Sequence, residues 1–383
     1  MAIANHLLHS SRTPTTGSPI LRLRSPQLEK RTAGVVRISA ARKPIDGVGE
    51  GLNAIASENM DFAPARRRVR SAFLETQQNL DHFLFKTAPA GIQVEEHYQT
   101  NSKELEIFWK RWLPSSDVPT KAALFFCHGY GDTCTFFFEG IAKRIAASGY
   151  AVYAMDYPGF GLSQGLHGYI PSFDQMVDHV IDQYTLIRGL KEVKGLPHFL
   201  LGQSMGGAVA LKVHLKQPKD WDGVVLVAPM CKIADTPPGP VLNAMRLLSY
   251  ILPEAKLFPT KDIGNLAFRD PKKGKAADFN VISYADQMRL RTAVELLKAT
   301  HDIEMNLEKV SSPLLILHGA ADKITDPQSS KFLYEKATTN DKTLRLYEEG
   351  YHCILEGEPD ERISGVIGDI ISWLDSHSSA TAL

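Results

Sequence analysis

The chain has 383 residues, of which 44% are hydrophobic, so it can bury a large core, and its length corresponds to about one and a half to two domains. Its 43 Lys and Arg residues balance its 43 Asp and Glu residues, and a net charge of zero argues against nucleic acid as a partner and against a strongly basic membrane-binding surface. No apolar run approaches the length of a membrane-spanning helix, so any contact with a membrane is expected to be peripheral.

Residues 1–43 differ in composition from the rest of the chain. They contain eight Lys or Arg, nine Ser or Thr and a single acid, Glu29. This basic, hydroxylated and acid-poor composition is typical of an organelle transit peptide, and the apolar core of a secretory signal is missing. Residues 38–41 also resemble the cleavage sites of chloroplast precursors. The sequence therefore predicts a chloroplast protein. The alternative is an unprocessed tail on a cytoplasmic protein with peripheral membrane association.

Residues 44–90 are predicted to form a linker and an N-terminal helix. Three glycines within 47–51 favour a flexible linker. The segment 63–85 begins with a cluster of arginines and carries a partial apolar stripe. Such a basic amphipathic helix can lie on an anionic membrane. Packing against the domain that follows is the more frequent arrangement, and it is the interpretation favoured here.

From residue 91 to residue 229, strands and helices alternate, which predicts the first part of a mostly parallel sheet flanked by helices. The segments 94–97 and 105–113 indicate an antiparallel hairpin at the start of this part. Apolar runs bounded by turn residues then predict strands at four further positions: 122–127, 150–155, 198–203 and 222–228.

The run 198–203 is followed at once by Gly202-Gln203-Ser204-Met205-Gly206 and by a helix-compatible segment that extends to Lys216. A serine with glycine two positions away on each side, between a strand and a helix, is typical of a nucleophile at the apex of a sharp turn. Side chains at the glycine positions would collide with the neighbouring strand and helix. Ser204 is therefore the predicted nucleophile of a hydrolase.

The alternation of strands and helices stops between residues 230 and 308. This section holds a proline cluster and two amphipathic patterns, near 241–252 and 285–300, and no clear buried strand. An insertion of this size between two strands is predicted to be a helical cap over the active site. Its apolar residues could line an acyl tunnel or pack against the domain, and the sequence leaves both open. These residues are Leu242, Met245, Leu248, Ile251 and Leu252.

Residues 309–377 are predicted to complete the sheet, with 378–383 as a tail. A buried strand at 313–318 precedes the loop that carries Asp322, and a half-buried strand at 343–348 precedes His352. Both side chains thus follow the carboxyl end of a strand, the edge where open parallel sheets place their sites. His318 lies before a glycine at a strand end, as does His128, and both are interpreted as structural turn residues.

A serine hydroxyl needs a base, and the base needs an orienting acid. The α/β-hydrolase fold places these groups in the order Ser, Asp or Glu, His, which predicts Ser204, Asp322 and His352 as a catalytic triad. Asp322 could instead cap a helix, but Asp326 before a proline is the better capping candidate. The fold forms its oxyanion hole from two backbone N–H groups, which correspond here to Tyr130 and Met205.

Several motifs in register resemble the monoacylglycerol lipases. They are His128–Asp132, Asp156–Ser163, Gly202–Gly207, His318–Asp322 and Gly350–His352. More closely, the chain resembles the plant branch of this family of serine-aminopeptidase-type hydrolases, whose members are often labelled caffeoylshikimate esterase-like. The resemblance covers roughly residues 95–376 and implies the α/β-hydrolase fold and the roles given above. The animal lipases differ in the 156–163 loop and in the cap, so their substrate preference does not transfer directly.

The resemblance implies hydrolysis of carboxylic esters through an acyl-enzyme, with a monoacylglycerol as the leading substrate. A phenolic ester such as caffeoylshikimate and a lysophospholipid are the alternatives within the same chemistry. A non-catalytic receptor on the same fold is the minor alternative, because such receptors lose the base and His352 is retained. No cofactor and no metal are expected, and the four cysteines lack metal-binding spacing and fit reduced thiols.

Overall fold

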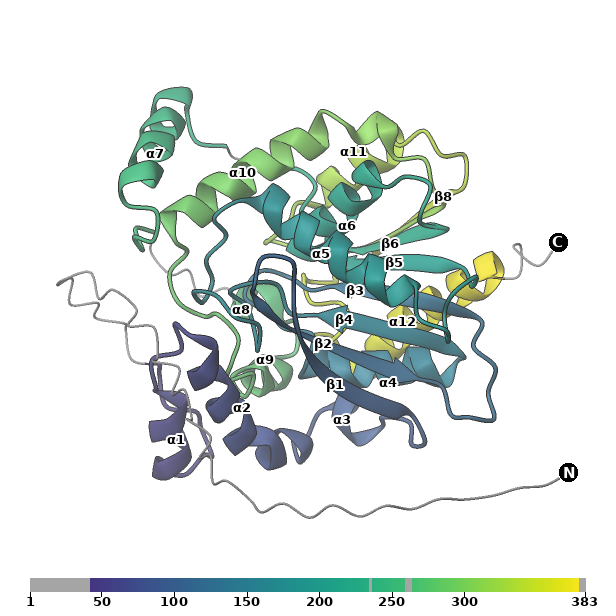
Figure 1. Cartoon of the computed structure of the whole chain (residues 1–383), viewed down its shortest axis with the longest axis horizontal. Coiled ribbons are helices and arrows are strands. Elements are labelled where there is room, and N and C mark those ends of the chain that lie inside the picture. The colour runs from purple at the N-terminus through teal and green to yellow at the C-terminus, as the bar shows by residue number, and fades with distance from the viewer. Residues whose placement is uncertain (1–41, 234–235, 259–263, 379–383) are drawn as a thin grey trace, which may run out of the picture. The chain divides into compact units, whose positions relative to one another are not determined.

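The computed structural model of the protein describes residues 42–233, 236–258 and 264–378 (Figure 1). Nearly all of the predicted transit peptide and of the 378–383 tail lies outside the described residues, so those two predictions stay untested. The strands of the described part form one eight-stranded sheet. They are β1 (Gln93–Thr100), β2 (Glu106–Leu113), β3 (Ala122–Cys127), β4 (Tyr150–Met155), β5 (His198–Gln203), β6 (Gly223–Val227), β7 (Leu314–Gly319) and β8 (Lys342–Tyr347).

The sheet has the order β1-β2-β4-β3-β5-β6-β7-β8, and only the pairs β1–β2 and β2–β4 are antiparallel. This confirms the predicted mostly parallel sheet with a hairpin at its start. Because β3 to β8 run in the same direction, the loops after their carboxyl ends meet at one edge. The loops that carry all the candidate site residues therefore come together there.

The core lies on both faces of the sheet. Along β3, Ala123 and Phe125 pack in one apolar cluster, while Leu124 and Phe126 pack in the other. Every residue of β3, β4 and β6 is buried, since helices cover both faces. Because both of their faces are buried, these strands are continuous apolar runs in the sequence. Such runs allowed the strands to be located before the structure was known.

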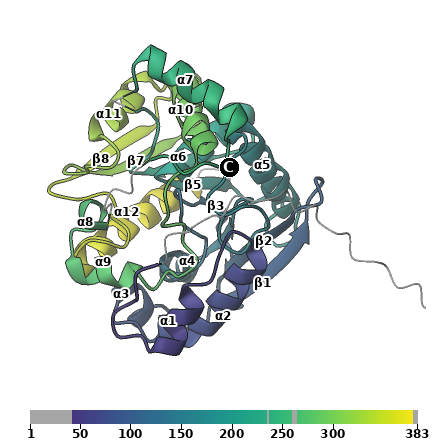
Figure 2. The same cartoon turned by 90° about the vertical axis from the view of Figure 1, so that its left-hand side faces the viewer.

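Helices form the outer layers, and the side view separates the two sets (Figure 2). One face is covered by α5 (Phe173–Arg188), α6 (Met205–Lys216), α10 (Leu290–Glu304) and α11 (Pro327–Lys336). The other is covered by α4 (Phe137–Ala147) and α12 (Asp360–Ser378), joined by the N-terminal helices α1 (Glu50–Ala56), α2 (Ala63–Gln78) and α3 (Phe83–Lys86). Within the described residues, no helix is both long and apolar enough to cross a bilayer.

The N-terminal segment differs from the prediction of a linker and one helix. Helix α1 begins at Glu50, inside the stretch interpreted as a flexible linker, because Asn53 ties the preceding turn through hydrogen bonds to Ile45 and Val48. The helix predicted over 63–85 ends at Gln78, and His82 starts a separate short helix by accepting a hydrogen bond from the Leu84 amide. The expected packing against the domain is confirmed, since the stripe of α2 is buried in the core.

Helix α2 is anchored by Arg66, whose side chain is fully buried. Its guanidinium donates to the carbonyl oxygens of Gly161 (2.5 Å) and Ser163 (2.6 Å) in the loop after β4, and to Met60 (2.8 Å) before the helix. Burial lowers the pKa of Arg66 to about 10, an effect that the nearby Asp156 partly opposes. One planar cation thus joins the N-terminal helices to a loop close to the site.

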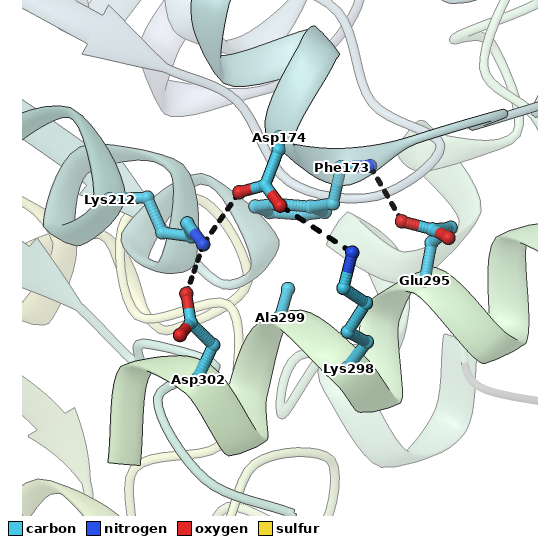
Figure 3. A pocket seen from close by; sticks show the side chains of 7 residues that line it. All are labelled: Phe173, Asp174, Lys212, Glu295, Lys298, Ala299 and Asp302. Carbon is cyan, nitrogen blue, oxygen red and sulfur yellow. Dashed lines mark hydrogen bonds and ion pairs between the residues drawn. The ribbon is translucent and has the colours of Figure 1, made fainter. Parts of the chain in front are cut away.

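The predicted helical insertion contains α7 (Gly239–Ile251), α8 (Gly264–Ala267), α9 (Pro271–Ala277) and α10. Helix α10 starts at Leu290, five residues later than the pattern suggested, after an isolated bridge between Lys256 and Arg289. Ion pairs fasten α10 to the domain: Lys212 of α6 contacts both Asp174 of α5, at 2.7 Å, and Asp302 of α10 (Figure 3). Helix α10 is therefore a fixed part of the insertion.

We expect Arg66→Ala to lower the free energy of unfolding by about 3 kcal/mol, because several buried carbonyl groups lose their donor. The change is measured by urea denaturation. Arg68→Ala is the matched control on the same helix, because the Arg68 side chain is 62% exposed and its ion pair with Glu58 lies at the surface. That control should cost less than about 0.5 kcal/mol, and equal losses for the two variants would contradict the anchoring role of Arg66.

Candidate active site

Ser204 lies where β5 turns into α6. Its backbone has φ 55° and ψ −121°, a conformation outside the regions that L residues ordinarily occupy. Three hydrogen bonds hold this turn. The Ser204 amide donates to the Val227 carbonyl at 3.0 Å, and the Ser204 carbonyl accepts from the amides of Gly207 and Met230, both at 2.9 Å. The strained turn is therefore fixed by β6 and by the helix that follows, as expected for a residue whose strain serves a site.

The glycines around Ser204 allow two backbone segments to approach closely. A Cβ on Gly206 would lie 1.9 Å from the carbonyl oxygen of Cys127 at the end of β3. A Cβ on Gly202 would lie 2.4 Å from the carbonyl oxygen of Gly206. Neither position can hold a side chain without moving backbone, so both glycines of the motif are required by contact.

The loop after β3 passes beside the serine. A Cβ on Gly129 would lie 3.4 Å from the Ser204 Cβ and 3.9 Å from its Oγ. Within the described residues, neither the amide of Tyr130 nor that of Met205 donates a hydrogen bond, so both N–H groups are free to bind an oxyanion. The loop is held in place by the Tyr284 amide, which donates to the Gly131 carbonyl at 2.7 Å.

Asp322 lies in the loop after β7, and its side chain is fully buried. One carboxylate oxygen accepts hydrogen bonds from the amides of Ile324 (2.7 Å) and Thr325 (3.1 Å). Burial alone would raise the pKa of Asp322, but hydrogen bonds from His318 and His352 outweigh it and hold that pKa well below its usual value. Asp322 is therefore ionised at neutral pH despite its burial.

His352 meets this carboxylate, with its Nδ1 2.7 Å from Oδ2 of Asp322. An ionised carboxylate only accepts hydrogen bonds, so Nδ1 carries a proton, and in the neutral ring Nε2 has the lone pair that a base needs. No hydrogen bond to Nε2 occurs within the described part of the chain. The approach of the His352 loop to β7 needs Gly319, because a Cβ there would lie 2.2 Å from the Tyr351 carbonyl oxygen.

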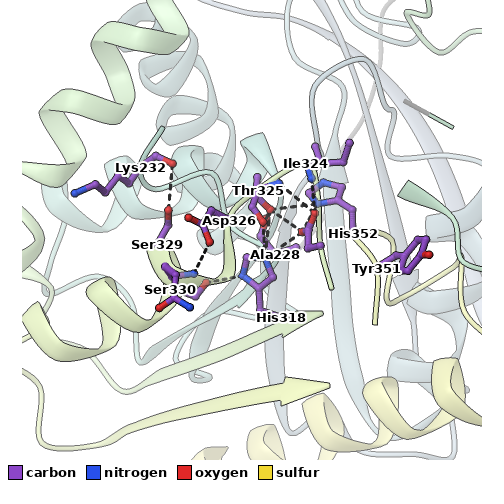
Figure 4. A network of polar contacts seen from close by, with 12 residues as sticks. Ala228, Lys232, His318, Ile324, Thr325, Asp326, Ser329, Ser330, Tyr351 and His352 are labelled. Atoms are coloured by element: carbon purple, nitrogen blue, oxygen red, sulfur yellow. Dashed lines mark hydrogen bonds and ion pairs between the residues drawn. The ribbon is translucent and has the colours of Figure 1, made fainter. Parts of the chain in front are cut away.

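The structure brings Asp322 and His352 together, but it shows no hydrogen bond from Ser204 Oγ to His352 among the described residues. The serine is linked to the pair indirectly. The hydroxyl of Thr325 lies 3.1 Å from the Ala228 carbonyl oxygen and 2.8 Å from Asp322 Oδ2 (Figure 4). Ala228 directly follows Val227, whose carbonyl oxygen accepts the hydrogen bond from the Ser204 amide. Catalytic hydrogen bonds are often long in enzymes without substrate, so this geometry is compatible with a triad.

Sequence reasoning missed several residues that contact the acid. His318, interpreted as a turn residue, lies with its Nε2 3.0 Å from Asp322 Oδ2, and Thr325 donates to the same oxygen. The spacing of four residues between His318 and Asp322, directly after a buried strand, was the available signal. Two other interpretations agree with the structure: Asp326 caps α11, and His128 packs as a buried structural residue against Tyr157.

The four cysteines are free and buried, as expected for reduced thiols. Cys353 follows the candidate base, but burial raises its pKa well above the usual value, so its thiol stays protonated. No cluster of His, Cys, Asp or Glu within the described ranges could hold a metal ion.

Helix α7 exposes most of the apolar residues considered for an acyl tunnel. Leu248, Ile251 and Leu252 are 42%, 68% and 50% exposed, and Leu242 and Met245 are half-buried. The helix lies beside α10, at the outer side of the insertion (Figures 1 and 2). Among the described residues, its exposed apolar side chains thus neither enclose a tunnel nor pack fully against the domain.

Comparison with known proteins identifies relatives over most of the chain. Residues 118–360 match the hydrolase family described as "Serine aminopeptidase, S33". A caffeoylshikimate esterase of Arabidopsis thaliana is 34% identical over 74% of this chain and 90% of its own length. The monoglyceride lipase of Homo sapiens is 30% identical over 72% of this chain and 88% of its own.

Solved structures agree with the fold. The crystal structure of a Paleococcus ferrophilus monoacylglycerol lipase superposes with a TM-score of 0.60 and 25% identity, covering 72% of this chain and 99% of that one. A soluble variant of monoglyceride lipase from Saccharomyces cerevisiae, in complex with a substrate analogue, gives a TM-score of 0.65 at 21% identity, covering 76% and 98%. The second likeness supports the α/β-hydrolase fold alone.

The close approach at Gly206 leads to a stability prediction. Gly206→Ala should lower the free energy of unfolding by about 2 kcal/mol or more and reduce activity, because the Cys127 backbone must move. Gly365→Ala is the control on an exposed part of α12, where the added methyl group meets no atom within 4 Å beyond its chain neighbours and the adjacent backbone of its own helix. It should stabilise the protein by about 0.5–1 kcal/mol. Equal unfolding midpoints for the two variants would show that the turn between β5 and α6 has room for a side chain at Gly206.

Proposed function

The chain belongs to the serine aminopeptidase family of α/β-hydrolases and is a carboxylic ester hydrolase, and on this premise we propose that Ser204 carries an acyl-enzyme in the hydrolysis of monoacylglycerols. The products are glycerol and a free fatty acid. The observation that carries the proposal is the buried 2.7 Å hydrogen bond between His352 and Asp322, at the same edge of the sheet as a serine on a strained turn.

The proposed reaction begins when His352 Nε2 takes the proton of Ser204 Oγ, which attacks the ester carbonyl carbon. The carbonyl oxygen becomes an oxyanion, and the free amides of Tyr130 and Met205 stabilise it. His352 then protonates the departing glycerol oxygen. In the second half of the reaction, water loses a proton to His352 and attacks the acyl carbon. The bond to Ser204 Oγ then breaks, His352 returns the proton to Oγ, and the fatty acid is released. Asp322 keeps the ring in the required tautomer and stabilises its cation.

The names of the relatives support two substrate classes. Monoacylglycerol is favoured by relatives named monoglyceride lipase in Mus musculus, Homo sapiens and Rattus norvegicus, all matching over 72% of this chain. Caffeoylshikimate is the second candidate, because an esterase named for it shares 34% identity with this chain. The chemistry at Ser204 is the same for both esters, so the substrate is decided by the insertion and not by the triad.

We expect Ser204→Ala to lose at least about a thousandfold in turnover of a soluble nitrophenyl ester with an unchanged unfolding midpoint, because only the attacking oxygen is removed. Ser71→Ala, an exposed position on α2, is the control and should keep full activity.

The wild-type protein should hydrolyse a monoacylglycerol with at least a tenfold higher kcat/KM than caffeoylshikimate. The reverse preference would replace the lipid substrate with the phenolic ester.

The proposed lipid substrate also requires access to a lipid surface, and we propose that α7 contacts it. The helix and the turn after it expose a group of large apolar side chains, comprising Val241, Leu247, Leu248, Tyr250, Ile251, Leu252 and Leu257. Arg246 is the only charged residue within Gly239–Ile251. An exposed apolar group of this size on a surface helix is typical of membrane or protein contact.

The double variant Leu247→Ser/Ile251→Ser should weaken sedimentation with phosphatidylcholine vesicles and slow hydrolysis of monoacylglycerol in them by about tenfold, because about 0.8 kcal/mol is lost per methylene no longer buried. Hydrolysis of a soluble nitrophenyl ester should not change. Leu186→Ser is the control, since Leu186 is 57% exposed on α5. Unaltered vesicle binding by the double variant would exclude α7 as the contact.

A further inference from the structure

His318 is fully buried at the end of β7 and makes contacts with both of its ring nitrogens. Nε2 lies 3.0 Å from Asp322 Oδ2 and 3.0 Å from the carbonyl oxygen of Thr325. A carbonyl oxygen only accepts hydrogen bonds, so the proton resides on Nε2 and is shared between these two acceptors. His318 is therefore a hydrogen-bond donor to the same carboxylate oxygen that binds His352.

The other nitrogen of His318 is held by α11. Nδ1 lies 2.7 Å from the hydroxyl oxygen of Ser330, which is also fully buried. Since Nε2 carries the proton, the Ser330 hydroxyl can donate to Nδ1 and thereby fix the tautomer. In Figure 4, His318 lies between Ser330 on one side and Thr325 and His352 on the other. A chain of hydrogen bonds thus runs from Ser330 through His318 to Asp322.

We propose that His318 is a positioning residue for the hydrolysis. Oriented by Ser330, His318 fixes the rotamer of Asp322 and draws part of the negative charge of Asp322 away from His352. The inference rests on the proposed function, because it assigns a role toward the His352–Asp322 pair. His318 contacts no reacting atom and acts only through the carboxylate. Its removal should make Asp322 a stronger partner for the His352 cation, since Oδ2 would then share its charge among fewer donors.

Two variants that differ by one methylene separate this role from simple packing. In His318→Asn, the amide reaches only the position of Nδ1, so Ser330 keeps a partner and Asp322 loses a donor. In His318→Gln, the amide reaches the position of Nε2, so the donor to Asp322 is kept. Because His318 is buried, the double variant His318→Leu/Ser330→Ala provides a second test, since it removes the ring together with the hydroxyl that binds it, and Ser330 is not left facing an apolar side chain.

The measurement is the pH dependence of kcat/KM for a soluble nitrophenyl ester. We expect the acidic limb to move to higher pH by about half to one unit in His318→Asn and in the double variant, and to return to the wild-type position in His318→Gln. His214→Leu is the control for loss of a buried histidine, because His214 lies near the far end of α6 from Ser204. An unmoved limb in the first two variants, or an equal movement in His214→Leu, would overturn the proposal.

Other titratable groups face the pair and must be distinguished from it. Glu356 and Cys353, from the loop after β8, interact electrostatically with His352 and Asp322 respectively, and Asp132, from the loop after β3, interacts with Glu356. Burial and the nearby Glu356 raise the pKa of Asp132 to about 7, so this carboxyl can titrate in the same range. The profile of Asp132→Asn locates its contribution. The His318 variants are then compared in Asp132→Asn protein. If the acidic limb still lies at higher pH in His318→Asn than in His318→Gln, the proposed role of His318 is supported. If the limb has the same position in both variants, that role is overturned.

A second readout does not depend on ester hydrolysis. The ring signals of His352 are followed by NMR in protein with isotope-labelled histidine, and are assigned by their absence in His352→Gln. Their titration should move to higher pH in His318→Asn and not in His318→Gln. If the wild-type protein hydrolyses no ester but the signals move as expected, the proposed function fails and the coupling of the two histidines through Asp322 stands. If esters are hydrolysed and the signals do not move, only the role of His318 fails.

Discussion

The contact between the start of α6 and the end of β3 is the constraint on which the candidate site depends. It exists because Gly206 has no side chain, so that its Cα can face the Cys127 carbonyl group directly. In this arrangement Ser204 has a positive φ, and the loop at Gly129 lies beside the serine hydroxyl. One backbone contact therefore sets both the direction of the nucleophile and the location of the free amides.

Asp322 is held in place in a different way, by hydrogen-bond donors that surround its buried carboxylate. Asp322 accepts hydrogen bonds from two amides, a hydroxyl and two histidine rings, and these outweigh the burial that would otherwise favour its neutral form. The donors come from β7, from the loop itself and from the loop after β8. Asp322 thus connects the two loops that follow the last strands of the sheet.

Parts of the chain outside the matched family segment also reach the insertion. Arg42 donates to the Val281 carbonyl at 2.6 Å, and Gln77 donates to the Phe279 carbonyl at 2.7 Å. A few residues later, Tyr284 is bonded to the loop at Gly131. The N-terminal helices therefore brace the segment of the insertion that holds the loop of the oxyanion candidates. By contrast, among the described residues α7 packs mainly against α10 and leaves large apolar side chains exposed, which fits the proposed contact with a lipid surface.

The sequence by itself determined the elements whose cause is local or repeated along the chain. The strands at 122–127, 150–155 and 198–203 were located to the residue, because strands covered on both faces are continuous apolar runs with turn residues at their ends. The motif around Ser204 was equally readable, since a sharp turn between strand and helix requires glycines at set positions. Asp322 and His352 followed from their places after strands that share one edge.

Tertiary structure alone decided which distant groups meet. His318 and Asp322 are only four residues apart, but their contact depends on Ser330 of α11 and on the approach of the His352 loop at Gly319. The sequence also did not reveal that 63–85 divides into two helices or that the apolar side chains of α7 are exposed. An apolar stripe shows that a face prefers to leave water, but it does not show which surface covers it. Periodicity and turn chemistry are properties of neighbouring residues, whereas partners are chosen by packing across the whole domain.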